Sequence, residues 1–171
     1  LRVDLESRRD ALAETVFAEH VRAGRIEFRL RADRLDYEIP QELLEDLPER
    51  PRPLFRPDGH PLERSLFDPI FESMLDNRFE SDIACYLDTQ AALSWWHRNV
   101  ARSGYGLQGW RRNKVYPDFV FAKTERDGRT ALVVLETKGV FLKNEDTEYK
   151  RRLLVALTEA FDDSRLVRGG E

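Results

Sequence analysis

The sequence has little cysteine and no long apolar run. Its only cysteine, Cys85, excludes an internal disulfide and supplies too few thiolates for a zinc site. We therefore expect a reducing, cytoplasmic setting. No segment approaches the roughly 18 consecutive apolar residues that span a membrane, and the opening LRVDLESRRD lacks the pattern of a signal peptide. These absences exclude disulfide-stabilised and membrane-spanning classes, so no membrane partner is expected.

An initiator methionine is also absent, because the chain begins at Leu1. This start predicts a fragment of a longer polypeptide, with partner domains outside it. The 171 residues suit one compact domain that carries an appendage.

Acidic residues are absent between Asp88 and Asp118, although the net charge of the chain is −4. A negative chain is not expected to coat nucleic acid over its whole surface. The acid-free interval instead predicts a restricted DNA contact, in which cations bind phosphates and Trp110 stacks on an unpaired base. These cations are Arg98, Arg102, Arg111, Arg112 and Lys114. Trp95 and Trp96 are interpreted as core side chains, because tryptophan buries a large apolar area.

Residues 1–61 are predicted to form an N-terminal appendage. Apolar residues at three- and four-residue steps predict a helix over 4–22 that ends at Gly24, and alternation predicts a strand over 26–30. Six prolines between Pro40 and Pro61 remove backbone donors and indicate a linker. The core domain is therefore expected to cover 62–171.

The core domain is predicted to run helix, three strands, helix, which places it in the α/β class. Asn77 is the expected N-cap of the second helical segment. The expected helices cover residues 66–75, 79–87 and 149–161, and the expected strands cover residues 106–112, 115–123 and 129–138.

The last two predicted strands are joined by Asp127-Gly128, a dipeptide typical of tight hairpin turns. Asp118 and Glu136 are equidistant from Asp127, so the hairpin places them opposite one another or one residue out of register. Opposed side chains lie ~4.5–5.5 Å apart at Cβ, which allows two carboxylates to share a cation. Lys138 lies two residues after Glu136 and shares its face, whereas Thr137 is expected to point away.

This group of side chains suits hydrolysis of a phosphodiester. Carboxylate oxygens are the ligands that Mg²⁺ prefers, and the ion keeps waters and accepts substrate phosphate. We interpret Asp118 and Glu136 as ligands and Lys138 as the group that orients the attacking water. Glu80, on the preceding helix, is a further candidate ligand or a hydrogen-bonding support for one.

The segments that carry these residues resemble the PD-(D/E)XK nuclease superfamily. The wider pattern is similar to the C-terminal endonuclease domain of type III restriction enzyme Res subunits and related helicase–nuclease fusions, over residues 66–162. The matching segments are YPDF (116–119), LVVLETKG (132–139), FESDIACYLD (79–88), WWHRN (95–99) and DTEYKRRLL (146–154).

The resemblance implies a restriction-endonuclease-like core of the α-β-β-β-α-β type, with a central mixed sheet flanked by helices and the N-terminal helix and strand appended. It implies a DNA endonuclease with catalytic Asp118, Glu136, Lys138 and Glu80, in which the three carboxylates bind Mg²⁺, or Mn²⁺ as a substitute. It also implies an upstream ATP-driven helicase or translocase, since the chain itself lacks a GxxxxGK[ST] segment. Cutting both strands usually needs two active sites, which makes a homodimer one expectation.

Alternatives remain at this stage. Glutamate beside lysine is often a surface ion pair, so the fold could have lost catalysis and serve as a DNA-binding module of a helicase. A protein-interaction domain, with the acidic segment 36–49 facing a partner, is the third interpretation. Glu80 is as readily an exposed helix carboxylate as a site residue. Tyr149 and Lys150, at the start of the last helix, face either the phosphate backbone or solvent.

Overall fold

The computed structural model describes residues 2–26, 46–102, 104–126, 128, 130–137 and 145–162. These residues form two compact units. The helical unit contains α1 (Arg2–Arg22), the segment Gly106–Tyr116 and α3 (Glu145–Asp162). The sheet unit contains the remaining described elements.

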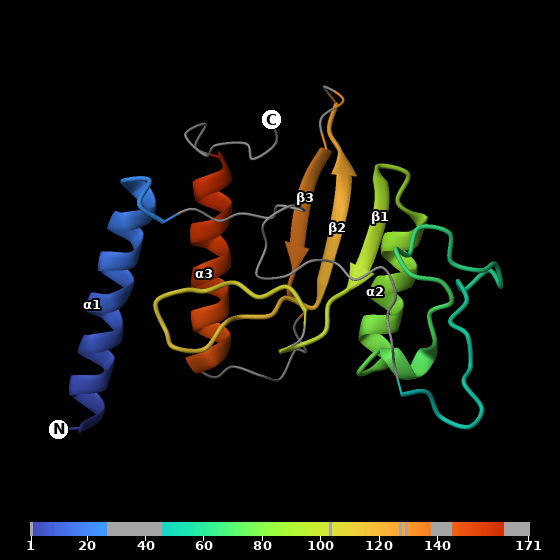
Figure 1. Ribbon diagram of the computed structural model, residues 1–171, viewed down its shortest axis with the longest axis horizontal. Helices are drawn as coiled ribbons and strands as arrows, with labels where there is room; N and C mark the ends of the chain where they lie inside the picture. The colour runs from blue at the N-terminus through green and yellow to red at the C-terminus, as the bar shows by residue number, and fades with distance from the viewer. Residues whose placement is uncertain are drawn as a thin grey trace. The chain divides into compact units, whose positions relative to one another are not determined.

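The sheet unit is built on three antiparallel strands in the order β1-β2-β3 (Figure 1). They are β1 (Leu93–Arg98), β2 (Phe119–Thr124) and β3 (Thr130–Leu135). The unit also holds a short 3₁₀ helix, η1 (Glu72–Met74), and α2 (Arg78–Thr89). The predicted α/β class is therefore confirmed, while the described strands form an antiparallel rather than a mixed sheet.

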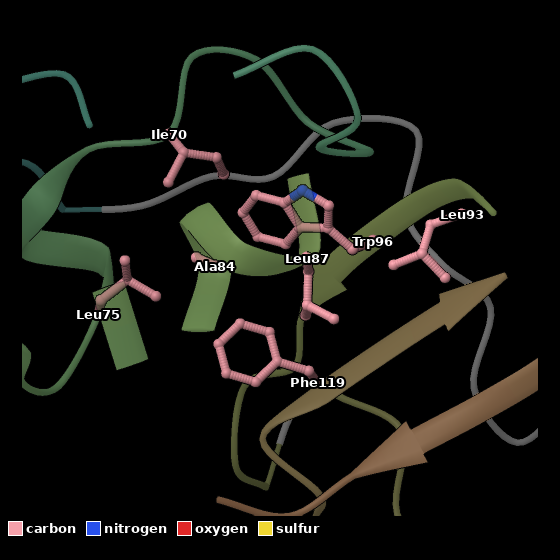
Figure 2. Close-up of a cluster of buried hydrophobic side chains, with 7 residues drawn as sticks. All are labelled: Ile70, Leu75, Ala84, Leu87, Leu93, Trp96 and Phe119. Atoms are coloured by element: carbon pink, nitrogen blue, oxygen red, sulfur yellow. The ribbon is translucent and has the colours of Figure 1, made fainter. Parts of the chain in front are cut away.

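The core of the sheet unit lies between α2 and the strands (Figure 2). Trp96 of β1 and Phe119 of β2 are fully buried, and their ring centroids lie 6.2 Å apart. The α2 side chains Ala84 and Leu87 face these rings because the helix carries its apolar residues on one side. This packing holds the first residue of β2 firmly against the helix.

The predicted hairpin is confirmed by β2 and β3. Gly128 adopts a φ of 81°, which glycine tolerates without strain, and its N–H donates to the carbonyl of Glu125 (3.0 Å). The helix predicted over 4–22 is confirmed by α1, and Gly24 follows it with a φ of 66°. Asn77 is the N-cap of α2, as predicted, and its side chain accepts from the N–H of Glu80.

Two predicted elements of the core are wrong. Residues 66–75 do not form a helix beyond η1, because Pro69 lacks an N–H and disfavours helical backbone before it. Residues 106–112 do not form a strand; they make one isolated bridge, Leu107 to Val115, and belong to the helical unit. β1 replaces that strand, at residues where only buried tryptophans were predicted.

The proline-rich residues 46–61, predicted to be a linker, pack against the sheet unit. The N–H of Leu54 donates to the carbonyl of Ile70 (2.8 Å), and the side chains of Leu54 and Leu62 contact the core cluster. The division into 1–61 and 62–171 stays a prediction about independent folding, and the strand predicted over 26–30 lies outside the described residues except for Ile26.

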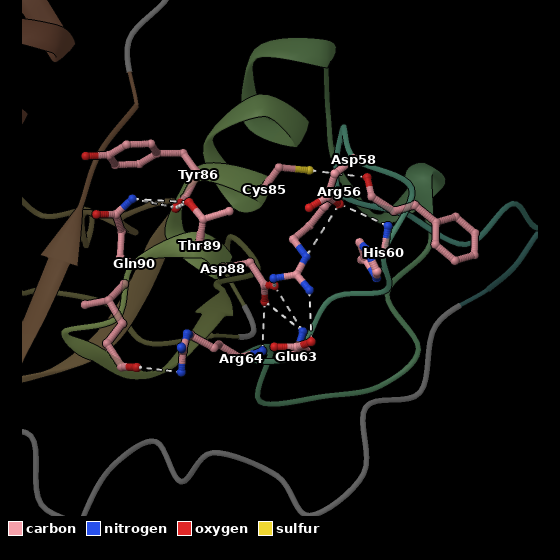
Figure 3. A network of polar contacts seen from close by, with 12 residues as sticks. Arg56, Asp58, His60, Glu63, Arg64, Cys85, Tyr86, Asp88, Thr89 and Gln90 are labelled. Carbon is pink, nitrogen blue, oxygen red and sulfur yellow. Dashed lines mark hydrogen bonds and ion pairs between the residues drawn. The ribbon is translucent and has the colours of Figure 1, made fainter.

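A buried polar network joins this segment to α2 and β1 (Figure 3). Asp88 is only 1% exposed, and its carboxylate accepts from the backbone N–H groups of Glu63 and Arg64 and from the indole of Trp96. Arg56 lies 3.8 Å from the same carboxylate. The paired charge and the three donors compensate the loss of hydration at Asp88.

Among the described residues, no helix is both long and apolar enough to cross a membrane.

Candidate active site

The candidate site lies where β2 begins and β3 ends, two points that the antiparallel pairing brings side by side (Figure 1). Phe119 pairs with Leu135, and Val120 pairs with Val134. Continued by one residue, this register sets Asp118 opposite Glu136. The predicted register is thus confirmed along the hairpin, and both carboxylates are half-buried rather than sealed away from solvent.

Thr137 fixes the carboxylate of Asp118. The backbone N–H and the hydroxyl of Thr137 both donate to Asp118 Oδ2, each at 2.6 Å. Thr137 was expected to point away from the site, and that expectation is wrong. β3 ends at Leu135, so strict alternation of side chains no longer applies two residues later. The Asp118 carboxylate, which precedes β2, is therefore bound to the segment that follows β3.

The backbone at Asp118 is held by Asn99, a residue that follows β1. The N–H of Asn99 donates to the carbonyl of Asp118 (2.8 Å), and its side-chain amide donates to the carbonyl of Pro117 (2.7 Å). Asn99 is 3% exposed, and its side chain also exchanges two hydrogen bonds with the backbone of Tyr105. Asn99 was not among the predicted site residues; the available signal was a polar residue directly after an aromatic-rich segment.

Glu136 is half-buried and directly follows the last residue of β3. Lys138, predicted to share its face, lies outside the described residues. The placement of the third member of the predicted group therefore stays a prediction.

Glu80 is placed in a different setting from Asp118. It is 5% exposed, so the interpretation as an exposed helix carboxylate is wrong. Its carboxylate accepts from the N–H of Asp76 and from the side chain of Asn77 (both 3.2 Å), and Arg98 lies 3.6 Å away. Glu80 thus completes the N-terminal cap of α2 and ties it to β1.

Within the described residues, no three His, Cys, Asp or Glu side chains are grouped so that they could hold one ion. A three-carboxylate site made of Asp118, Glu136 and Glu80 is therefore not formed by the residues that are described. Two carboxylates with a substrate phosphate and waters still match the oxygen donors that Mg²⁺ takes.

Two residues beside the site are held internally. Arg98, a predicted DNA contact, forms an ion pair with Asp76 (2.9 Å) in addition to its pairing with Glu80. His97 is 4% exposed and meets the edge of Phe67 at 5.2 Å between ring centroids. Burial, and to a lesser extent the adjacent Arg98 charge, lowers the pKa of His97 to about 4, so the ring is neutral at pH 7.

Three further predicted DNA contacts form a cluster inside the helical unit. Arg111 pairs with Asp10 of α1 (2.9 Å), and its guanidinium lies 4.6 Å from the centroid of the Tyr149 ring. Trp110 meets that ring edge-on at 4.8 Å and donates to Asp10 (3.2 Å). The hydrogen bond from Arg111 lowers the pKa of Asp10. The cluster joins α1, Gly106–Tyr116 and α3, and Tyr149 is buried at its centre.

The remaining predicted contacts are more accessible. Arg102, Arg112 and Lys114 are exposed, and Lys150 is half-buried on α3. Arg102 has a φ of 72°, in a tight loop between Asn99 and Tyr105. The exposed cations are the ones whose charge is available to a phosphate without breaking a buried ion pair.

Comparisons with protein-family models, with curated proteins and with solved structures found no match.

Proposed function

We propose that the chain is the nuclease domain of a larger cytoplasmic restriction or helicase–nuclease protein, and that it hydrolyses phosphodiester bonds of DNA with Mg²⁺. The observation that carries the proposal is the β2–β3 register, in which Phe119 pairs with Leu135; continued by one residue, it sets Asp118 opposite Glu136. Two carboxylates at the spacing of opposed strand residues repel one another, and a bound cation would offset that repulsion.

The donor chemistry of the site fits a hard divalent cation. Asp118 presents a carboxylate whose Oδ2 is already held by Thr137, which directs its other oxygen and limits rotation of the group. Glu136 supplies the second carboxylate from the adjacent segment. When bound, Mg²⁺ supplies a water of lowered pKa and neutralises charge on the phosphate.

The chain's own residues have distinct roles in this proposal. Asp118 and Glu136 hold the ion, and Lys138 orients the attacking water and donates to the phosphate. The exposed Arg102, Arg112 and Lys114 bind the phosphate backbone, since their charges are accessible to DNA. Glu80 supports the site indirectly through Arg98 and the capped end of α2, rather than as a ligand.

The fold assignment is part of the same proposal. The order α2-β1-β2-β3-α3 is compatible with a restriction-endonuclease-like core. The sequence resemblance alone supports two further parts of the proposal: a strand that would make the sheet mixed, and an upstream helicase or translocase. A homodimer is proposed because cutting both strands usually needs two active sites.

The experiment compares cleavage of supercoiled DNA in Mg²⁺, in Mn²⁺ and in EDTA. The proposal expects cutting in either metal, none in EDTA, and none by Glu136→Gln or Lys138→Ala. Asp82→Asn is the matched control, because Asp82 is an exposed carboxylate on α2, and it should cut normally.

Intact DNA in both metals would overturn the catalytic proposal. A salt-dependent gel shift by the same protein would then assign it to the inactive DNA-binding class, and the absence of any shift would favour a protein-interaction domain.

A further inference from the structure

The loop after β1 closes on the residues that precede β2. Asn99 lies at its start, and its side-chain amide donates two hydrogen bonds, to the carbonyls of Pro117 (2.7 Å) and Tyr105 (2.8 Å). Its side-chain oxygen accepts from the N–H of Tyr105 (2.7 Å). Every polar atom of this buried amide group is therefore engaged with backbone.

Gly104 brings the loop close to the side chain of Asn99. Gly104 donates its N–H to the carbonyl of Val100 (2.7 Å), and a methyl group at Gly104 would collide with Asn99 Oδ1 and with the backbone of Val100. The backbone N–H of Asn99 donates to the Asp118 carbonyl, and its side-chain amide donates to the Pro117 carbonyl. The backbone is therefore held on both sides of the Asp118 Cα.

We propose that Asn99 is the positioning residue for Asp118. It holds the Pro117 and Asp118 carbonyls on one side, and this sets the carboxylate where the N–H and hydroxyl of Thr137 reach it on the other. The inference rests on the proposed function, since bracing Asp118 affects catalysis only if Asp118 is a ligand. The brace itself is a property of the folded chain and is measurable without metal or DNA.

The test uses hydrogen exchange at the Thr137 amide, which is bonded to Asp118 Oδ2. Asn99→Ala should speed this exchange at least about tenfold relative to the amide of Trp96, which donates to Arg64 within the same unit. Asn99→Asp should do the same, because a carboxylate keeps the acceptor for Tyr105 but loses both donors. Ile70→Ala, a buried core change, is the stability-matched control and should alter both amides in parallel.

The unmodified protein provides a measurement that does not depend on variant folding. The backbone N–H of Asn99 donates to the Asp118 carbonyl, and the backbone N–H of Thr137 donates to the Asp118 carboxylate. Both N–H groups should therefore exchange through one opening event with the same denaturant dependence. Two results would overturn the proposal. One is an exchange rate of the Thr137 amide that is unchanged in both Asn99 variants. The other is a Thr137 amide that, in the unmodified protein, exchanges more than about tenfold faster than the Asn99 backbone amide through a separate opening.

A metal titration separates this inference from the proposed function. Asn99→Asp should weaken Mn²⁺ binding about tenfold and lower kcat while leaving KM for DNA unchanged, whereas Ile70→Ala should change neither. If the unmodified protein neither binds Mn²⁺ nor cuts DNA, the nuclease proposal fails, and the exchange data still decide whether Asn99 positions Asp118.

Discussion

Asp88 and Asp118 are two aspartates of one compact unit with opposite surroundings. Asp88 is enclosed: donors from Glu63, Arg64 and Trp96 converge on it, and Arg56 balances its charge. Asp118 is half-buried, and the donors from Thr137 reach only its Oδ2. A complete set of protein partners suits a carboxylate that stabilises the fold. In the proposed function Asp118, which Thr137 holds through Oδ2, offers its other oxygen to the cation.

The largest expected effect concerns Asp118. Asp118→Asn should lower the rate of DNA cutting on the order of 10³-fold, because an amide is a poor ligand for a hard cation. The free energy of unfolding should change by less than about 1 kcal/mol, since an amide oxygen still accepts from Thr137. Cleavage assays and urea unfolding of the same preparation measure both quantities, and equal cutting by variant and parent would remove the distinction from Asp88.

Asp88 should show the reverse behaviour. Asp88→Ala leaves the backbone N–H groups of Glu63 and Arg64 and the indole of Trp96 without their acceptor, and it removes one of the carboxylates near Arg56. The expected loss is about 3–5 kcal/mol of unfolding free energy, a large part of the stability of a small domain. Urea denaturation followed by tryptophan fluorescence reports it. A loss below about 1 kcal/mol would show that the enclosed network is dispensable.

His97 extends the contrast to a buried base. Its pKa falls from 6.5 to about 4 on folding, so between these values the unfolded chain binds the proton and the folded chain does not. The free energy of unfolding is therefore unaffected by His97 above pH 6.5, and protonation of this residue in the unfolded chain lowers it by about 3 kcal/mol by pH 4. His97→Gln should lack this component, which is measured as a smaller drop in unfolding free energy between pH 7 and pH 4.

The smallest effects concern the two neighbouring arginines of the helical unit. Arg111→Ala should lower the unfolding free energy by about 1–2 kcal/mol, because it removes the pairing with Asp10 and the contact with Tyr149. Arg112→Ala should leave stability unchanged, weaken DNA binding a few-fold and reduce the salt slope by about 1. Identical effects of the two variants would mean that exposure does not separate structural from binding arginines in this unit.

The hairpin and the register of Asp118 against Glu136 could be predicted from the sequence, because Asp-Gly and period-two alternation are local signals. β1 could not, since Trp95 and Trp96 follow a helix with no turn signal and fit a buried helix end equally well. Pro69 was the evidence against a helix over 66–75 and was outweighed there by the spacing of apolar residues.

The hydrogen bonds that hold the site in place could not be predicted from local sequence patterns. Asn99 bonds residues 6 and 18 positions away, and these partners are brought together only by the path of the loop after β1. The cluster around Arg111 has the same origin, since its partner Asp10 lies 101 positions away along the chain. Both groups consist of polar residues whose partners depend on tertiary structure. The number of positive charges in a segment therefore led to the prediction that Arg111 contacts DNA, although it pairs with Asp10.

The close approach of Gly109 to α3 implies that this position can accept a larger residue only after its neighbours on α3 have changed. A methyl group at Gly109 would lie 2.5 Å from the hydroxyl oxygen of Tyr149 and 3.0 Å from both terminal carbons of Leu153. Tyr149→Phe removes the closest of these contacts, and the flexible end of Leu153 would still have to shift by a few tenths of an ångström, so Gly109→Ala should cost less stability when combined with Tyr149→Phe than alone. Among sequences that share this unit, a residue larger than glycine at the first position is therefore expected only where the second is not tyrosine.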